Sequence, residues 1–230
     1  MSRLTGQERA TYVQNMFTRI AGRYDLMNRL MTAGQDIRWR RQVIQLAQLR
    51  PHARLLDLGT GTGDLAREAL AQVPQAKVIA ADFTLEMMRV GQKHGRLDFS
   101  SADALRLPFN ESSFDAVVSG FLMRNVIDLQ RALQEQHRVL KKGGRLVILD
   151  TTRPRKNVLS PFINVHMHVL IPLLGRLLTG SSDAYHYLPE TTEGFVTAEN
   201  MASRMAAVGF KKLNFERLMF GTIAIHWGEK

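Results

Sequence analysis

From residue 53 to residue 150, short apolar runs alternate with segments of helical periodicity, and this alternation restricts the fold more than any other feature. The apolar runs are ARLLDLG, AKVIAAD, LDFSSAD, FDAVVSG and GRLVILD, at residues 53–59, 76–82, 97–103, 114–120 and 144–150. The helical segments cover residues 63–73, 84–94 and 129–140. Strands that alternate with helices form a parallel sheet covered by helices on both faces. The pattern therefore predicts a doubly wound α/β fold.

The two ends of the chain follow other patterns. Residues 7–20 and 36–48 have apolar positions at helical spacing, and residues 23–36 between them are interpreted as a short irregular piece. Near the C-terminus, residues 199–209 predict a helix, and residues 210–230 predict two strands with little between them. Two adjacent terminal strands favour an antiparallel hairpin on the sheet edge. We therefore expect a mostly parallel seven-stranded sheet at 51–230 behind an N-terminal helical cap at 1–50.

A glycine-rich turn follows the first predicted strand. It consists of Asp57, Leu58, Gly59, Thr60, Gly61, Thr62, Gly63 and Asp64. Glycine at every second position lets the backbone turn tightly and approach a ligand without side-chain clashes. Gly61–Ala66 fits the dinucleotide fingerprint G-x-G-x-x-G/A, with Asp82 near the position expected for a ribose contact. A nicotinamide dinucleotide is therefore one candidate cofactor.

The carboxylates around this turn favour a cationic ligand instead. Asp57 and Asp64 flank the turn and would repel a pyrophosphate at the helix N-terminus. S-adenosylmethionine has a sulfonium and an α-amino group, which avoid this conflict. Asp82 could then accept hydrogen bonds from the ribose hydroxyls, and Asp103, next to Ala104, from the adenine amino group. These residues follow successive strands at the carboxyl edge, where open α/β sheets bind ligands, although each could simply cap the following helix.

Five motifs together resemble a known family. DLGTGTGDLA, AADFTLEMM, ADALRLPF, FDAVVSGFLMRNV and HRVLKKGGRLVILD, in this order, resemble class I S-adenosylmethionine-dependent methyltransferases. More narrowly, the chain resembles the ubiquinone/menaquinone biosynthesis C-methyltransferases. FTRIAGRYDLMNRLMTAGQDIRWRR is similar to the N-terminal signature of that family, AYHYLPETTEGF to its segment before the last helix, and Arg124-Asn125 to its arginine-asparagine pair. The resemblance covers roughly residues 13–228.

The resemblance implies a fold, a cofactor and a reaction. The fold is that of a class I methyltransferase, and the reaction is methyl transfer from S-adenosylmethionine to a ring carbon of a demethylated prenyl quinol. Demethylmenaquinol is the favoured acceptor, and another small phenolic or amphipathic compound is the alternative. Further cofactor contacts are expected from Tyr24, Phe83, Met87 and Gly120.

The resemblance also assigns catalytic roles. Arg124 would polarise a ring hydroxyl so that the phenolate forms more readily, and Asn125 would orient that group. The alternative for Arg124 is a structural ion pair with a carboxylate, and the alternative for Tyr24 is packing of the N-terminal helix. Departures from the family pattern lie on the substrate side. Leu122 stands where the family has glycine, and the fifth strand ends in LDTTRP instead of glutamate and an aromatic residue.

Charge and composition exclude several other functions. The chain has 31 Lys and Arg against 21 Asp and Glu, a net charge of +10, which favours anionic partners. No aromatic-basic recognition motif supports nucleic acid as that partner. Cysteine is absent, so no thiolate nucleophile and no metal site are predicted. The N-terminus lacks the pattern of a secretory signal, and a cytoplasmic location is expected.

Residues 158–178, VLSPFINVHMHVLIPLLGRLL, are apolar but interrupted by histidine, proline and arginine. This segment has three interpretations: part of the core, a lid over an apolar tunnel, or a helix that touches a membrane. We favour a lid or tunnel wall within a substrate lid insertion at 153–195. A prenyl tail and a basic surface together predict transient contact with an anionic membrane, so the protein would be peripheral at its inner face. The sequence allows a homodimer without specifying the oligomeric state.

Overall fold

The protein is described here by a computed structural model that covers residues 6–153, 169, 191–192 and 194–230. The N-terminal helices are α1 (Gly6–Ile20), η1 (Ala21–Arg23), α2 (Tyr24–Met31) and α3 (Gln35–Ala47). They are followed by β1 (Arg54–Leu58), α4 (Asp64–Gln72), β2 (Lys77–Asp82), α5 (Leu85–Lys93), β3 (Asp98–Ser101), β4 (Phe114–Gly120) and α6 (Leu129–Val139). The remaining elements are β5 (Leu140–Thr151), α10 (Ala198–Val208), β6 (Lys211–Leu218), η3 (Met219–Gly221) and β7 (Ile223–Glu229).

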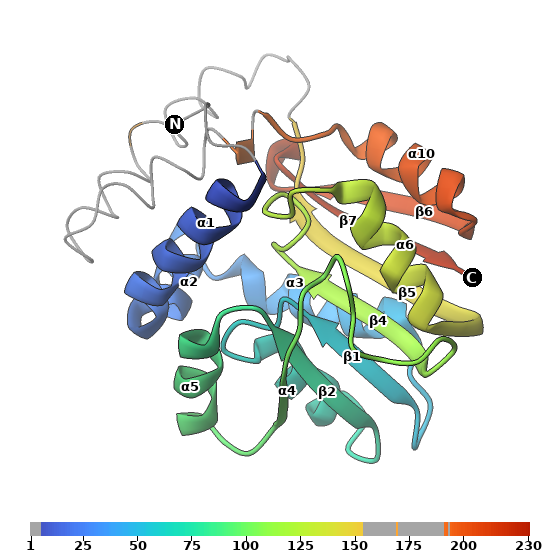
Figure 1. The fold of residues 1–230 in the computed structure, drawn as a ribbon, viewed down its shortest axis with the longest axis horizontal. Helices are drawn as coiled ribbons and strands as arrows, with labels where there is room; N and C mark the ends of the chain where they lie inside the picture. The colour runs from blue at the N-terminus through green and yellow to red at the C-terminus, as the bar shows by residue number, and fades with distance from the viewer. Residues whose placement is uncertain (1–5, 154–168, 170–190, 193) are drawn as a thin grey trace.

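The described strands form one seven-stranded sheet in the order β3-β2-β1-β4-β5-β7-β6 (Figure 1). Strands β1 to β5 pair in parallel, whereas β7 is antiparallel to both β5 and β6. The predicted doubly wound sheet and its C-terminal hairpin are therefore confirmed. The strand order reverses between β1 and β4, and ligands of open α/β sheets bind at such a reversal.

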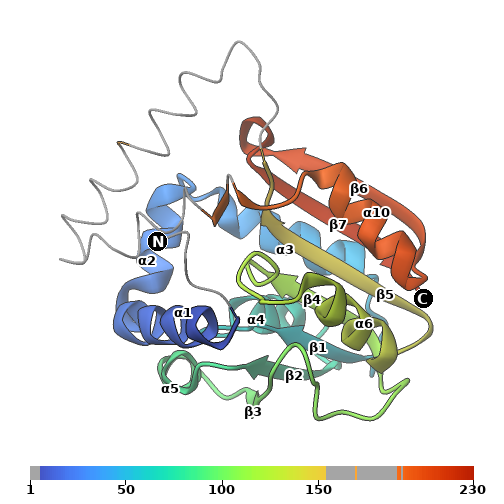
Figure 2. The same cartoon turned by 45° about the horizontal axis from the view of Figure 1, so that its top comes forward.

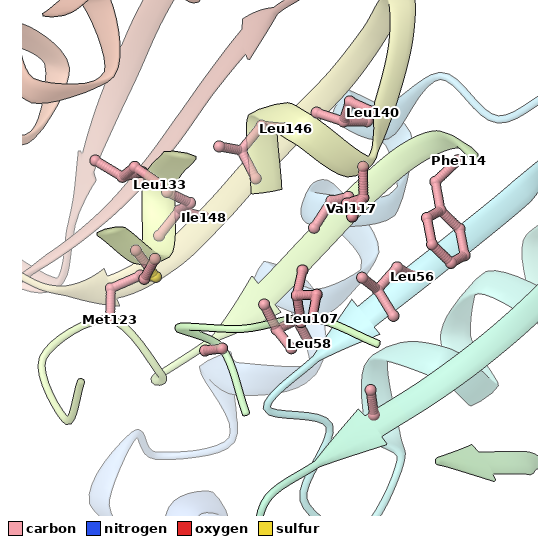
Figure 3. Packing of buried hydrophobic residues seen from close by; sticks show 14 of the residues in the cluster. Leu56, Leu58, Leu107, Phe114, Val117, Met123, Leu133, Leu140, Leu146 and Ile148 are labelled. Atoms are coloured by element: carbon pink, nitrogen blue, oxygen red, sulfur yellow. The ribbon is translucent and has the colours of Figure 1, made fainter. Parts of the chain in front are cut away.

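Period-two alternation along the strands divides the core between the two faces of the sheet. In β5, Leu146 and Ile148 join the cluster that includes residues of α6 and α10, part of which is seen in Figure 3. The alternate residues Val147 and Leu149 join the cluster that includes residues of α3 and α4. Because successive strand side chains point to opposite faces, continuous apolar runs produce a sheet buried on both sides.

The prediction of an irregular piece at residues 23–36 is wrong, because its first part forms α2. Met27 of this helix is only 1% exposed, whereas Leu26 and Leu30 are 53% and 41% exposed. Apolar residues therefore occupy both the inner and the outer side of α2. This arrangement hides the helical period on which a prediction from the sequence depends.

The fifth strand is also longer than predicted. It begins at Leu140 and runs through Gly143 and Gly144, where the sequence indicated a turn. Its pairing with β4 shifts register between Phe114 and Ala116. A β-bulge of this kind accommodates extra residues within a strand, so a glycine pair can be absorbed in the strand.

The N-terminal helices fall into two groups. Helix α3 packs on the sheet, where Trp39 and Val43 belong to the same buried cluster as Leu55 of β1. Helices α1 and α2 have their own small cluster, which includes Val13 and Met27, and α1 lies beside α5 (Figure 2). We call residues 6–31 the cap helices. The domain division at residue 50 stays a proposal.

Most of the predicted lid insertion at 153–195 and almost all of segment 158–178 lie outside the described residues, as does most of AYHYLPETTEGF. Val169 is described, and it is 57% exposed. Among the described helices, none has the length and apolar character that a membrane span requires.

Candidate cofactor and acceptor site

The glycine-rich turn connects β1 to α4 at the carboxyl edge of the sheet. Gly63 immediately precedes α4 with a φ of 93°, a left-handed conformation that favours glycine. A Cβ atom at Gly63 would lie 2.5 Å from Cδ1 of Leu97. A Cβ at Gly59 would lie 2.9 Å from two carbons of Leu122. Both the backbone conformation and the tight packing therefore require glycine at these two positions.

Asp57 is fully buried beneath the turn. Its Oδ2 accepts hydrogen bonds from the hydroxyl of Thr60 at 2.5 Å and from the backbone N–H of Ala66 at 3.0 Å. Its Oδ1 has no hydrogen-bond partner within the described protein. Burial, together with smaller contributions from the carboxylates of Asp82 and Asp64, raises the pKa of the Asp57 carboxyl to about 7. The fold thus maintains a costly buried carboxylate, which a cationic ligand would stabilise.

Asp82, at the end of β2, fixes the other side of the turn. Its Oδ2 accepts a hydrogen bond from the N–H of Gly61 at 2.8 Å, and its Oδ1 accepts one from Thr84 N–H at 2.7 Å. Burial raises the pKa of this carboxyl. Asp103 follows β3, is exposed, and accepts a hydrogen bond from the N–H of Leu105 at 2.9 Å. Each aspartate thus accepts a hydrogen bond from the N–H two residues later, but neither caps a helix, because the N-cap of α5 is Thr84 and no described helix lies between β3 and β4. Both also line the cavity.

One cavity brings together most of the predicted site residues. Its lining includes Tyr24, Gly59, Gly61, Asp82, Phe83, Met87, Asp103, Ala104, Gly120 and Asn125. The other predicted site residues, Asp57, Thr60, Thr62, Gly63 and Arg124, do not belong to this lining. Among them, Asp57 accepts hydrogen bonds from Thr60 and Ala66 and so holds the turn from beneath.

The cap helices supply a wall that the sequence did not assign to the site. Val13, Gln14 and Phe17 of α1 line the cavity together with Tyr24 of α2. The rings of Phe17 and Tyr24 meet edge to face with centroids 5.7 Å apart, and burial raises the pKa of the Tyr24 phenol. The apolar face of the helix at 7–20 was visible in the sequence, but its role in the cavity depends on tertiary packing.

Two polar contacts attach the cap helices to the cofactor side of the cavity. The Thr62 hydroxyl in the glycine turn donates to Oδ1 of Asp25 at 2.9 Å. The side-chain amide of Gln14 donates to the carbonyl of Phe83 at 3.3 Å. The position of the cap is therefore coupled directly to the conformation of the turn.

Arg124 forms a buried ion pair. Its Nη1 lies 2.7 Å from Oδ1 of Asp150, and the two side chains are 7% and 3% exposed. Its backbone N–H donates to Oδ2 of the same carboxylate at 3.2 Å. The structural alternative for Arg124 therefore has direct support, while its predicted action on an acceptor stays a proposal. Asn125 lines the cavity and donates from its amide to the carbonyl of Phe121 at 3.1 Å.

Gly91 in α5 is a site-supporting residue that the sequence analysis missed. A Cβ atom there would lie 2.4 Å from the carbonyl oxygen of Thr62, so α5 packs directly against the glycine turn. Arg67 of α4 joins the same contact, because it donates to the carbonyls of both Thr62 and Gly91. A glycine within a helix is the only local signal, and it suggests a close approach without identifying the partner.

Gly91→Ala should therefore damage cofactor binding without touching the cavity. The methyl group must displace the backbone at Thr62, so the turn should shift and the affinity for S-adenosylmethionine should fall at least about tenfold. Overpacking of this kind typically costs about 1–3 kcal/mol. Calorimetric titration measures the affinity, and Gly22→Ala is the control, because a Cβ there meets nothing within 4 Å and the backbone φ is not positive. Equal affinity in Gly91→Ala and the parent would show that the turn does not depend on this contact.

Arg40 of α3 compensates the acidic character of the turn. Its Nη2 lies 2.8 Å from the buried carboxylate of Asp36, and its Nη1 forms an ion pair with Asp64, the first residue of α4. Asp25, Asp57, Asp64 and Asp82 all lie in or beside the turn. Arg40 thus forms ion pairs with two carboxylates, those of Asp36 and Asp64. Oδ1 of Asp57, by contrast, has no hydrogen-bond partner within the described residues.

The residues present fit S-adenosylmethionine. The buried Asp57 has an unpartnered oxygen suited to a cationic group. Carboxylates lie at or near the carboxyl ends of β1, β2 and β3. Apolar side chains of Phe83, Met87 and Leu105 also line the cavity. A dinucleotide pyrophosphate would have to approach the same carboxylates, which disfavours it.

Comparison with solved structures defines the class of protein. A Thermotoga maritima S-adenosylmethionine-dependent methyltransferase, titled a possible histamine N-methyltransferase, superposes with a TM-score of 0.67 and 20% identity over 94% of this chain and 98% of that one. The [4+2]-cyclase SpnF superposes with a TM-score of 0.70 and 17% identity over 98% and 96% of the two chains. At these identities the likeness shows the fold alone. The fold is that of the class I S-adenosylmethionine-dependent methyltransferases, and the residues that line the cavity fit this cofactor.

Sequence comparison identifies the family. The model of the ubiE/COQ5 methyltransferase family matches residues 5–230, so the chain belongs to this family. It is 45% identical to the ubiquinone/menaquinone biosynthesis C-methyltransferase UbiE of Desulfotalea psychrophila, over 95% of this chain and 90% of that protein. It is 43% identical to the demethylmenaquinone methyltransferase of Thermus thermophilus, over 94% and 100%. The predicted family, methyltransferase activity and cofactor are therefore confirmed.

Proposed function

We propose that this protein methylates a ring carbon of a demethylated prenyl quinol, with demethylmenaquinol as the acceptor. S-adenosylmethionine supplies the methyl group when it is bound. One bond forms between the methyl carbon and the ring carbon, the sulfur–methyl bond breaks, and the hydrogen of that ring carbon leaves as a proton. The names of the relatives from Desulfotalea psychrophila and Thermus thermophilus support this choice of acceptor.

The observation that carries the proposal is a single cavity with two different walls. One wall contains the glycine turn and Asp82, which suit a polar, cationic cofactor. The opposing wall contains Val13, Phe17 and Tyr24 of the cap helices, which suit an apolar aromatic ring. Bringing donor and acceptor together in a fixed arrangement is the main task of a methyl-transfer site.

On the acceptor side, we assign Arg124 and Asn125 to the ring hydroxyl. The positive charge of Arg124 would favour the phenolate, which pushes electron density onto the ring carbon. The ion pair with Asp150 supports this role by fixing the guanidinium in one position. Asn125 reaches the cavity and would orient the hydroxyl.

On the donor side, Asp82→Ala should weaken S-adenosylmethionine binding about tenfold to a hundredfold. We assign the carboxylate to the ribose hydroxyls, and unpaired buried donors cost about 1–3 kcal/mol. Calorimetric titration measures the affinity. Asp98→Ala, at the opposite end of strand β3 from the cavity, should bind like the parent. Unchanged affinity in Asp82→Ala would remove Asp82 from the cofactor contacts.

Quinone analysis in cells tests the proposed reaction. Cells that lack the gene should accumulate the demethylated quinone, and expression of the protein should restore the methylated form, as identified by mass spectrometry. An Asp82→Ala variant should restore it poorly. An unaltered quinone profile in the deletion strain would refute the proposed acceptor and leave another phenolic compound as the alternative.

The remaining sequence predictions concern delivery and assembly. A prenyl quinol resides in membrane, so the protein has to meet a bilayer at least transiently, and the net charge of +10 favours an anionic one. We propose that the predicted lid at 158–178 takes part in this membrane contact. We also propose that the protein forms a homodimer. Light scattering of the purified protein measures its oligomeric state and tests this proposal.

A further inference from the structure

Helix α2 has two distinct faces. Tyr24, Met27 and Asn28 are spaced as one helical face, and on this face Tyr24 lines the cavity while Met27 is buried. The opposite face presents Leu26 and Leu30, which are 53% and 41% exposed. A pair of leucines four residues apart forms a continuous apolar patch on a helix surface. This patch is a candidate contact surface because it lies on the same short helix as a wall of the cavity.

Basic residues border this patch. Arg23 lies three residues before Leu26, Arg29 lies beside Leu30, and both arginines are exposed. The acidic residue of the helix, Asp25, is engaged with Thr62 at 2.9 Å in the glycine turn. The outer face of α2 thus combines leucine with arginine, the composition of helices that lie in the headgroup region of anionic bilayers.

We propose that the outer face of α2, formed by Arg23, Leu26, Arg29 and Leu30, docks the protein on an anionic lipid bilayer. The inner face of the same short helix lines the cavity through Tyr24, so docking would place the acceptor wall next to the membrane that holds the substrate. This inference rests on the proposed function for its purpose, but it concerns a different surface from the predicted lid at 158–178.

Charge removal with a matched control tests the electrostatic part. Arg23→Gln/Arg29→Gln removes two cations from the patch, and Nε of Arg29 lies 3.3 Å from Oδ1 of Asp36. Lys141→Gln/Lys142→Gln removes two cations elsewhere, one of them paired with Asp115 at 2.7 Å. Vesicles of phosphatidylglycerol and phosphatidylcholine should bind the arginine variant roughly 30-fold more weakly than the parent. The lysine variant should bind almost as well as the parent, and equal losses in both would overturn the proposal.

The leucines are tested separately. Leu26→Ser/Leu30→Ser should reduce vesicle partitioning at least about tenfold, since each leucine contributes apolar area to the bilayer contact. The melting temperature should stay near that of the parent, because about half of each side chain is already exposed to solvent. Phe220→Ser removes another apolar side chain, 68% exposed in η3, and should leave binding unchanged. A similar loss in Phe220→Ser would place the bilayer contact elsewhere.

Activity measurements separate this inference from the proposed function. The leucine variant should methylate a short-tail demethylmenaquinol in solution at the parent rate, and a long-tail quinol in vesicles at least tenfold more slowly. A parent protein that methylates the short-tail quinol but does not bind anionic vesicles would refute the docking surface alone. A parent that binds vesicles but methylates neither quinol would refute the proposed function alone. Loss of a dimer in the leucine variant, without any change in vesicle binding, would assign the patch to a second copy of the chain.

Discussion

Arg124→Met is expected to lower both the stability and the methyl-transfer rate of the protein. The substitution leaves Asp150, which is 2% exposed, as a buried carboxylate without its cationic partner. Breaking a buried ion pair in this way costs about 3–5 kcal/mol. Chemical denaturation measures this loss, and single-turnover methyl transfer at a temperature where the variant is folded measures the rate.

The double variant Arg124→Met/Asp150→Leu separates the two effects. Removing both charges should recover most of the lost stability, because an apolar pair is no worse than the ion pair it replaces. Methyl transfer should stay depressed if Arg124 has the role we propose, since the positive charge assigned to the ring hydroxyl is still missing. Recovery of the full rate together with the stability would reduce Arg124 to a structural residue.

Asp57→Asn should stabilise the free protein at neutral and alkaline pH. The pKa of Asp57 is about 7 in the folded protein and about 4 in an unfolded chain. Between these values the folded protein retains a proton that the unfolded chain has released, so the free energy of unfolding of the parent falls as pH rises. The variant has no ionisable group at position 57, so its free energy of unfolding does not fall with pH in this way. Its advantage should grow from none at about pH 3 to as much as about 4 kcal/mol at pH 8.

The same substitution should weaken S-adenosylmethionine binding. Asp57 lies beneath the turn and outside the cavity lining, so we propose that its charge attracts a cationic group of the ligand across the turn. Only the ionised carboxylate supplies this attraction. Affinity in the parent should therefore rise between about pH 5.5 and 7.5, while the variant binds weakly with little dependence on pH. Calorimetry across this range measures both. A variant that binds as tightly as the parent at pH 7.5 would show that Asp57 only supports the turn.

Local patterns were sufficient to predict the sheet and the cofactor wall. Each strand is an apolar run ended by a turn residue, and the carboxylates Asp57, Asp82 and Asp103 follow three of these strands. Because parallel strands bring their carboxyl ends to one edge, the positions of these residues predicted a common site. The lining of the cavity includes Asp82 and Asp103, and Asp57 lies directly beneath the turn.

Contacts between distant segments were beyond such reasoning. Gly91 is required by the carbonyl of Thr62, and Asp150 holds Arg124 across 26 residues of sequence. Neither residue type reveals its partner. Helix α2 was missed for a different reason, since its outer leucines obscure the helical period. The features that the sequence did not predict are thus the ones that depend on tertiary packing.

Direct analysis of the reaction product tests the central claim. Purified protein is incubated with methyl-labelled S-adenosylmethionine and a short-tail demethylmenaquinol kept reduced, and the product is examined by mass spectrometry and NMR. The proposed function predicts one labelled methyl group on the ring carbon and one S-adenosylhomocysteine formed for each product molecule. A label found on a quinol oxygen, or no labelled quinol while another phenolic acceptor is methylated, would contradict it.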